Sequence, residues 1–171
     1  CSSLAGAQEI SKTWVADKGN GTYQNPVLHA DYSDPDICAA GDDFYMTASS
    51  FNCIPGIPIL HSNDLVNWSL VNYALPVQEP EPFFDKAQHG KGVWAPAIRF
   101  HNGEFYIYWG DPDYGIYMIK AKDPKGKWSK PVLVKAGKGM IDATPLWDED
   151  GKVYLIHAYA GSRSGVNSIL V

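Results

Sequence analysis

The chain has 171 residues, of which 45% are hydrophobic and 19% charged, so it can bury a core and is not a disordered polypeptide. The net charge of −5 excludes a protein that binds nucleic acid mainly through phosphates, and no apolar run reaches the roughly 18 residues of a membrane-spanning helix. An aromatic content of 13%, with 16 Gly and 12 Pro, is typical of all-β folds with many short strands.

Residues 1–24 form a polar leader in which Gly19, Asn20 and Gly21 interrupt any regular element. The leader begins CSSLAGAQ and has no apolar stretch of the kind found in a signal peptide. A mature bacterial lipoprotein begins at the cysteine that carries its lipids, and this start resembles one. We therefore expect a lipid anchor at Cys1 on an exported bacterial protein of the cell envelope or periplasm. The alternative is an arbitrary boundary placed at a cysteine.

A domain is expected over residues 25–171, as short apolar or aromatic runs separated by turn residues. Several runs alternate with period two and no 3.6-residue stripe is present, so we expect most of them to be β-strands. In chain order, the runs are DICAA, DFYMTAS, IPILHS, WSLVNYAL, VWAPAIRF, EFYIYWG, GIYMIKA, KPVLVKA, ATPLWDED, KVYLIHAYA and SILV.

The runs repeat along the chain. A turn followed by an aromatic strand occurs at 42–45 and again at 102–106, and Trp68 and Trp128 lie 60 residues apart. A third unit begins with the turn at 150–154. A four-stranded antiparallel sheet repeated radially is the blade of a β-propeller, so the pattern predicts two blades and the opening of a third. A β-sandwich of about ten strands is the alternative.

Three carboxylates stand in unusual settings, namely Asp34, Asp36 and Asp142. Asp34 precedes Pro35, which fixes the chain as it enters a strand, and this position suits a base aimed into a pocket. Asp142 lies in an apolar stretch, where burial would cost free energy unless the charge is paired or used. We expect Asp34 and Asp142 to open onto one pocket from neighbouring repeats. The alternative is that each caps a turn.

Four ordered segments carry a family resemblance: NPVLHADYSDPDI, SSFNCIPGIPILHSNDLVNWSLV, GVWAPAIRFHNGEFYIYW and MIDATPLWDEDGKVYLIHAYAG. Over residues 25–171 they resemble the N-terminal half of the catalytic domain of glycoside hydrolase family 43, especially its β-xylosidase and α-L-arabinofuranosidase members. The resemblance implies a five-bladed β-propeller, of which this chain covers roughly the first two to three blades, the remaining half lying outside it. It also implies a glycosidase that hydrolyses terminal xylose or arabinose from plant cell-wall oligosaccharides and polysaccharides with inversion.

The resemblance implies roles for single residues. Asp34 in SDPDI matches the general base of the family, and Asp142 in MIDATP matches the acid that raises the pKa of the proton donor and orients it. Phe51 and Trp94 match aromatic residues that wall the sugar pocket, ordinary packing being the alternative. The donor is a Glu in an EGP-type motif that this sequence lacks, so we expect the region to be inactive by itself.

The family resemblance implies no required cofactor. Some members hold a structural calcium ion in the axial channel through a later histidine, and the five histidines of this chain show no metal-ligand spacing. Cys38 and Cys53 are expected to be free buried thiols, and Trp68, Trp128 and Trp147 to pack within the repeats.

Two classes of function stay open from the sequence. One is the glycosidase, and the other is a non-catalytic carbohydrate-binding propeller on the cell surface. The paired acids favour the enzyme, because a binding protein needs aromatic platforms but not paired carboxylates. An interaction scaffold would need an exposed apolar face, which the sequence does not reveal. Xylosides and arabinofuranosides are not distinguished at this level.

Overall fold

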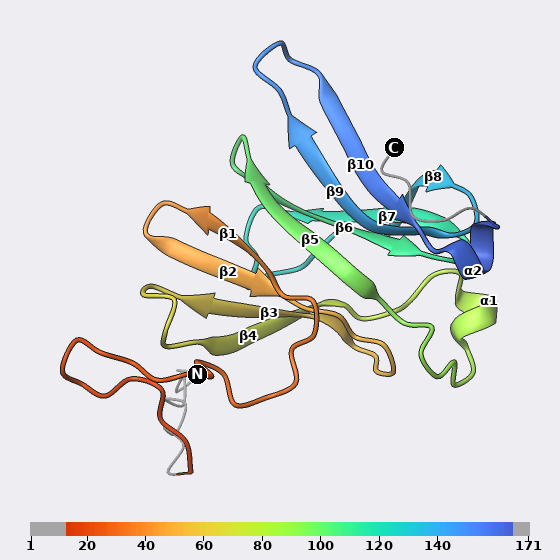
Figure 1. Ribbon diagram of the computed structural model, residues 1–171. Helices are drawn as coiled ribbons and strands as arrows, with labels where there is room; N and C mark the ends of the chain where they lie inside the picture. Colours follow the sequence, from red (N-terminus) through yellow and green to blue (C-terminus); the bar gives the residue numbers. More distant parts are fainter. Residues whose placement is uncertain (1–12, 166–171) are drawn as a thin grey trace, which may run out of the picture.

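The computed structural model describes residues 13–165, and this part of the chain is all-β, as predicted, with two helices of a single turn (Figure 1). Every predicted run from DICAA to KVYLIHAYA forms a strand. The last run, SILV, and the expected anchor at Cys1 lie outside the described residues. Within 13–165, neither helix has the length and apolar character needed to cross a bilayer.

The strands form three antiparallel sheets in which neighbours follow the order of the chain. The first contains β1 (Asp36–Ala40), β2 (Asp43–Thr47), β3 (Gly56–Ser62) and β4 (Ser69–Leu75). The second contains β5 (Trp94–His101), β6 (Glu104–Asp111), β7 (Gly115–Ala121) and β8 (Val132–Ala136). The third contains β9 (Met140–Trp147) and β10 (Val153–Tyr159). Helix α1 (Glu81–Phe84) lies between β4 and β5, and α2 (Gly161–Ser164) follows β10.

The sequential strand order differs from the Greek-key connections of a β-sandwich, which was the alternative architecture. It is the order of strands within a propeller blade. The third sheet begins at Met140 and not at the turn of residues 150–154, because β9 precedes that turn. The turns inside the repeats therefore mark the step from the first to the second strand of each sheet.

The hairpin between β5 and β6 shows why the sequence turns where it does. His101 pairs with Glu104, which leaves Asn102 and Gly103 as a two-residue loop. Both have left-handed backbones, with φ of 48° and 79°. A two-residue hairpin that matches the twist of the strands needs positive φ at both positions, and Asn-Gly is the pair that adopts it most readily.

Alternate residues of β6 pack against the sheets on either side. Phe105 meets Tyr45 of the first sheet edge to face at 5.1 Å, and the buried Trp109 and Trp128 belong to the same core. Tyr106 faces the other way, 5.1 Å from Trp147 of the third sheet. The second sheet is thus packed on both faces, and β5 lies between β1 and β9 (Figure 1).

The described part of the leader, residues 13–24, packs beside the first sheet. A bridge between Asp17 and Tyr23 closes a small hairpin, and the Asn67 amide donates a hydrogen bond of 2.9 Å to the Asp17 carboxylate. The Trp14 indole donates to the carbonyl of Pro26 at 2.8 Å. The Asn67 bond holds the leader against the loop between β3 and β4.

Candidate active site

Three non-glycine residues at or just before the beginnings of β1, β5 and β9 have left-handed backbones. They are Asp34, Ala95 and Asp142, with φ of 49°, 36° and 55°. Such a conformation costs an L-residue about 1–3 kcal/mol and persists only where the surroundings enforce it, which happens most often at functional sites. Because a left-handed residue occurs at this place in all three sheets, the end of the sheets where β1, β5 and β9 begin is the candidate site.

The first and third of these positions hold Asp34 and Asp142, two of the three carboxylates singled out from the sequence. They come from the first and the third sheet, with β5 of the second sheet between them. The expectation that neighbouring repeats supply the two acids was therefore wrong. The second sheet carries Ala95 at the matching place, so it contributes backbone where its neighbours contribute Asp34 and Asp142.

The Asp34 carboxylate is oriented by hydroxyl groups. Ser49 donates to Oδ2 at 2.7 Å and Ser33 donates to the same oxygen at 3.2 Å. Ser49 Oγ in turn accepts a hydrogen bond of 2.8 Å from the backbone N–H of Ala95. The Ser49 hydroxyl therefore uses its own proton for the bond to Asp34. Within residues 13–165 the Asp34 carboxylate accepts no backbone N–H, so it does not cap a turn.

Asp142 is exposed, and none of the described residues hydrogen-bonds its carboxylate. Its pKa is raised above the usual aspartate value, first because the carboxyl loses hydration and second because the charge of Asp34 acts on it. The two acids therefore influence each other electrostatically across β5. Two like charges in one site favour retention of a proton, as in other carboxylate pairs of hydrolytic enzymes.

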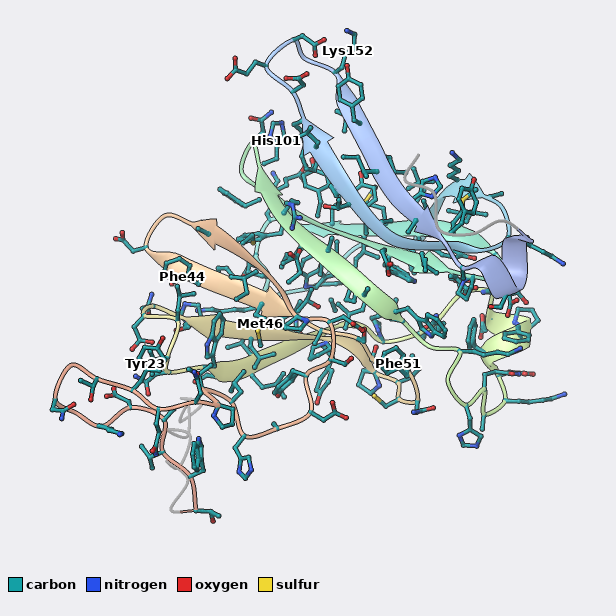
Figure 2. The ribbon with its side chains drawn as sticks, viewed as in Figure 1. Tyr23, Phe44, Met46, Phe51, His101 and Lys152 are labelled. Carbon is teal, nitrogen blue, oxygen red and sulfur yellow. The ribbon has the colours of Figure 1, made fainter. Side chains whose placement is uncertain are left out.

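The aromatic residues Phe51 and Trp94 meet edge to face, with ring centroids 6.0 Å apart, and Figure 2 shows Phe51 beside the beginning of β5. A bridge between Ser50 and Val93 brings the two segments together, with backbone hydrogen bonds of 3.0 Å in both directions. Gly92 is required here, because a Cβ would lie 2.1 Å from the Ser50 carbonyl oxygen. The pair offers apolar faces of the kind that pack on sugar C–H groups.

A cavity of about 290 Å³ lies beside the Phe51 loop. It is lined by Phe51 and its neighbours in the loop, by the buried Gln78 and by residues 84–88. Asp34, Asp142 and Trp94 do not belong to its wall. The acids and Trp94 thus share one end of the first strands and lie outside the wall of this cavity.

Sequence reasoning missed two residues that organise this end. Ser49 lies in SSF, and this local pattern gives no sign of its contact with Asp34, 15 residues earlier in the chain. Arg99 lies in the apolar run VWAPAIRF and pairs with Asp36, although an arginine inside an apolar strand is itself a signal that a partner is near.

Cys53 is exposed and not buried as expected, because its loop lies at the surface.

Cys38 is a free buried thiol, and burial raises its pKa to about 12. Among residues 13–165, no three His, Cys, Asp or Glu side chains gather in a way that could hold a metal ion. A structural calcium ion in the axial channel of the intact protein stays a prediction of the family resemblance.

Comparison with known proteins identifies the family of the chain. The family model for glycosyl hydrolases family 43 matches residues 23–171. The chain belongs to this family. It is 37% identical to a β-xylosidase of Formosa agariphila over 96% of the chain and 29% of that protein. It is 39% identical to a non-reducing end α-L-arabinofuranosidase of Bacteroides ovatus over 84% of the chain and 28% of that protein.

Solved structures of the family have the same fold over this region. A family 43 protein of the Bacteroides ovatus xyloglucan locus superposes with a TM-score of 0.69 at 36% identity, covering 78% of this chain and 27% of the other. A xylan β-1,4-xylosidase of Bacillus halodurans superposes with a TM-score of 0.71 at 30% identity, covering 84% and 28%. The chain therefore spans less than a third of the length of these family 43 relatives.

Proposed function

We propose that the whole protein is a glycosidase that removes terminal xylose or arabinose from plant cell-wall oligosaccharides and polysaccharides with inversion, on a propeller of five blades. The observation that carries the proposal is the pair of acids, Asp34 and Asp142, which have left-handed backbones beside the beginnings of β1 and β9. Relatives named β-xylosidase and α-L-arabinofuranosidase support the substrate class.

Asp34 is the general base in this proposal. Its carboxylate takes a proton from water as the water oxygen attacks the anomeric carbon, so the new bond forms on the face opposite the leaving group. The hydroxyls of Ser33 and Ser49 hold Oδ2, which leaves the other oxygen, Oδ1, to accept the water proton. Phe51 and Trp94 would pack against the apolar face of the sugar.

Asp142 acts on the proton donor. An inverting glycosidase places its base and its acid about 6.5–9.5 Å apart, and a third carboxylate near the donor raises the donor's pKa by like-charge repulsion. The donor is expected to be a Glu in the part of the relatives that this chain does not span. Asp142 needs no hydrogen bond from the first three sheets for this role.

A carbohydrate-binding protein without catalysis remains the second candidate, since Phe51 and Trp94 alone would serve it. The two candidates differ in what they require of Asp34. A binding protein retains its affinity for xylo-oligosaccharides when Asp34 loses its charge and shows no turnover in the wild type.

The test is Asp34→Asn in the whole protein, assayed on nitrophenyl β-xyloside and nitrophenyl α-L-arabinofuranoside. Removal of a general base should lower kcat by about 10²-fold or more with KM little changed. Asp31→Asn is the matched control. Asp31 is exposed and lies three residues before Asp34, so this variant makes the same chemical change outside the site. Retention of more than a tenth of wild-type kcat by Asp34→Asn would reject the assignment.

Cys1 is proposed as the lipid-bearing residue of an exported protein of the cell envelope or periplasm, supported by its place ahead of a small polar segment. One acyl chain gives only marginal anchoring, so more than one chain is expected on the cysteine. Mass spectrometry of the native protein decides this, and a free Cys1 thiol would remove the proposal.

A further inference from the structure

The side chain of Arg99 connects the first strands of all three sheets by hydrogen bonds. Arg99 lies in β5, and its guanidinium donates to the Asp36 carboxylate of β1 and, from Nη2, to the Thr144 hydroxyl of β9 at 2.9 Å. Its Nη1 also donates to the carbonyl of Ile98 at 2.6 Å. The planar guanidinium thus bridges three elements that are far apart in the sequence.

The two partners stand in the same relation to the two acids. Asp36 comes two residues after Asp34, and Thr144 comes two residues after Asp142. Two residues of extended chain span at most about 7 Å, so a shift of either partner moves the acid next to it. Each partner of Arg99 is therefore two residues from one of the two acids, so Arg99 can influence the position of both.

The contacts are of the kind that fix geometry. The Asp36 carboxylate also accepts the Ile98 backbone N–H at 2.7 Å, so it is held by both a cation and a main-chain donor of β5. The Arg99 and Asp36 side chains are 34% and 31% exposed, so solvent only partly screens their attraction. Arginine suits this position because its fork of donors reaches two partners in a fixed plane, which the point charge of lysine cannot do.

We propose that Arg99 is a positioning residue that sets the separation between Asp34 and Asp142 by tying β1 and β9 to β5. This inference rests on the proposed glycosidase function. The separation matters because Asp34 delivers water to the anomeric carbon while Asp142 acts on the donor on the other side of the sugar, and a displacement of about 1 Å can cost 10²-fold in rate. Arg99 itself touches no reacting atom in this account.

The test uses the whole protein with Arg99→Met, which keeps the aliphatic stem and removes the fork. We expect kcat to fall by about 10- to 100-fold while KM changes less than threefold, because substrate contacts stay and alignment is lost. Arg99→Lys should recover part of the kcat through Asp36 alone. Thr144→Val, which keeps the shape of threonine and removes its acceptor, should lower kcat with Asp36 and Arg99 still paired.

Lys120→Met is the matched control. Lys120 pairs with Glu104 at 2.9 Å within the second sheet, so this variant removes a cation from a strand of the same sheet without touching β1 or β9. Its kcat per folded molecule should equal that of the wild type. A kcat for Arg99→Met that equals the Lys120→Met value would show that Arg99 serves only general stability and would overturn the proposal.

A second readout does not depend on turnover. The pKa of Asp142, followed by ¹³C NMR of labelled aspartate, should move toward the ordinary aspartate value in Arg99→Met and Thr144→Val, because a displaced β9 lets the carboxyl regain hydration and moves it away from the charge of Asp34. A protein that shows this shift but no glycosidase activity would refute the proposed function and keep the positioning role. An unchanged Asp142 titration in both variants would overturn the positioning role, even if Arg99→Met folds poorly, because Thr144→Val tests the same link.

Discussion

At the scale of single residues, Ser49 is the side chain that connects the candidate base to the second sheet. Its hydroxyl accepts from the Ala95 N–H and donates to Asp34, so it fixes the carboxylate relative to the strained backbone of β5. A hydroxyl that accepts an N–H on one side has its own proton free for one partner only. The orientation of Asp34 therefore follows from the fold and does not require substrate.

Ser49→Ala should lower kcat by about tenfold with little change in KM, a loss of about 1.4 kcal/mol that lies near the lower end of the roughly 1.5–3 kcal/mol of a hydrogen bond to a charged group. Ser33→Ala is the comparison, because it removes the longer bond to the same oxygen, 3.2 Å against 2.7 Å, and no link to Ala95. Steady-state kinetics on the whole protein measure both variants. Equal losses in the two variants would contradict the role given to Ser49.

Asp111 is a buried acid outside the pair. It accepts the backbone N–H groups of Asp113 and Tyr114, yet its burial raises its pKa to about 6. As pH rises from about 4 to about 6, the unfolded chain loses this proton before the folded protein does. Stability therefore falls through this range, and the loss is complete above about pH 6.

Asp111→Asn keeps an acceptor for both N–H groups and removes the ionisation. The variant should be more stable than wild type at pH 7 by about 1–3 kcal/mol and similar to it at pH 4. Thermal unfolding of the two proteins at both pH values measures the difference. A variant that is less stable than wild type at pH 7 would show that the charge of Asp111 is used in the fold.

At the scale of elements, the position of β9 depends on how closely it approaches β6. A Cβ on Gly110 would lie 2.5 Å from the carbonyl oxygen of Met140 and 2.6 Å from the Cα of Ile141. Both atoms are backbone of β9, immediately before Asp142. No flexible side chain can yield there, so the glycine sets the place of the acid as well as the packing of the sheets.

Gly110→Ala should push β9 outward, destabilise the protein by about 1–3 kcal/mol and lower kcat. Gly103→Ala, in the hairpin at the far end of β5, meets nothing within 4 Å and strains only its own backbone, where φ is 79°. It should lower the melting temperature and leave kcat per folded molecule unchanged. Calorimetry and kinetics of both variants separate the two effects, and an unchanged kcat in Gly110→Ala would contradict the role of β9.

The strands were predictable because their signals are local. Asn102-Gly103 specifies a hairpin and FYIYW alternates with period two, so elements could be read from neighbouring residues. The acids Asp34 and Asp142 were found through motifs around them. What joins them was not predictable, because the contacts of Ser49 with Ala95 and of Arg99 with Thr144 span 46 and 45 residues and depend on how whole sheets pack.

At the scale of the whole molecule, the third sheet presents an apolar outer face. Leu146, Tyr154 and Ile156 lie on it and are 51%, 43% and 37% exposed. On the second sheet the corresponding outward residue Tyr106 is covered by Trp147 of the next sheet. In a five-bladed propeller, a further blade would cover the third sheet in the same way.

The region 1–171 alone should therefore self-associate and show no hydrolysis of the two nitrophenyl glycosides above background. Self-association follows from the apolar face, which remains exposed. The loss of hydrolysis follows from the missing proton donor, because an unassisted leaving group departs about 10²- to 10⁴-fold more slowly. Light scattering and rate measurements on the purified region test this. Robust turnover would mean that the donor is one of the five glutamates present.

The stereochemistry of hydrolysis tests the central claim most directly, because it reports whether Asp34 delivers water or forms a bond to the sugar. Proton NMR of the whole protein acting on a β-xyloside, or on an α-L-arabinofuranoside if that is the better substrate, identifies the anomer released before mutarotation. The pair of acids predicts the inverted product, α-xylose or β-arabinofuranose, as the first signal. A first product of retained configuration would contradict Asp34 as a general base.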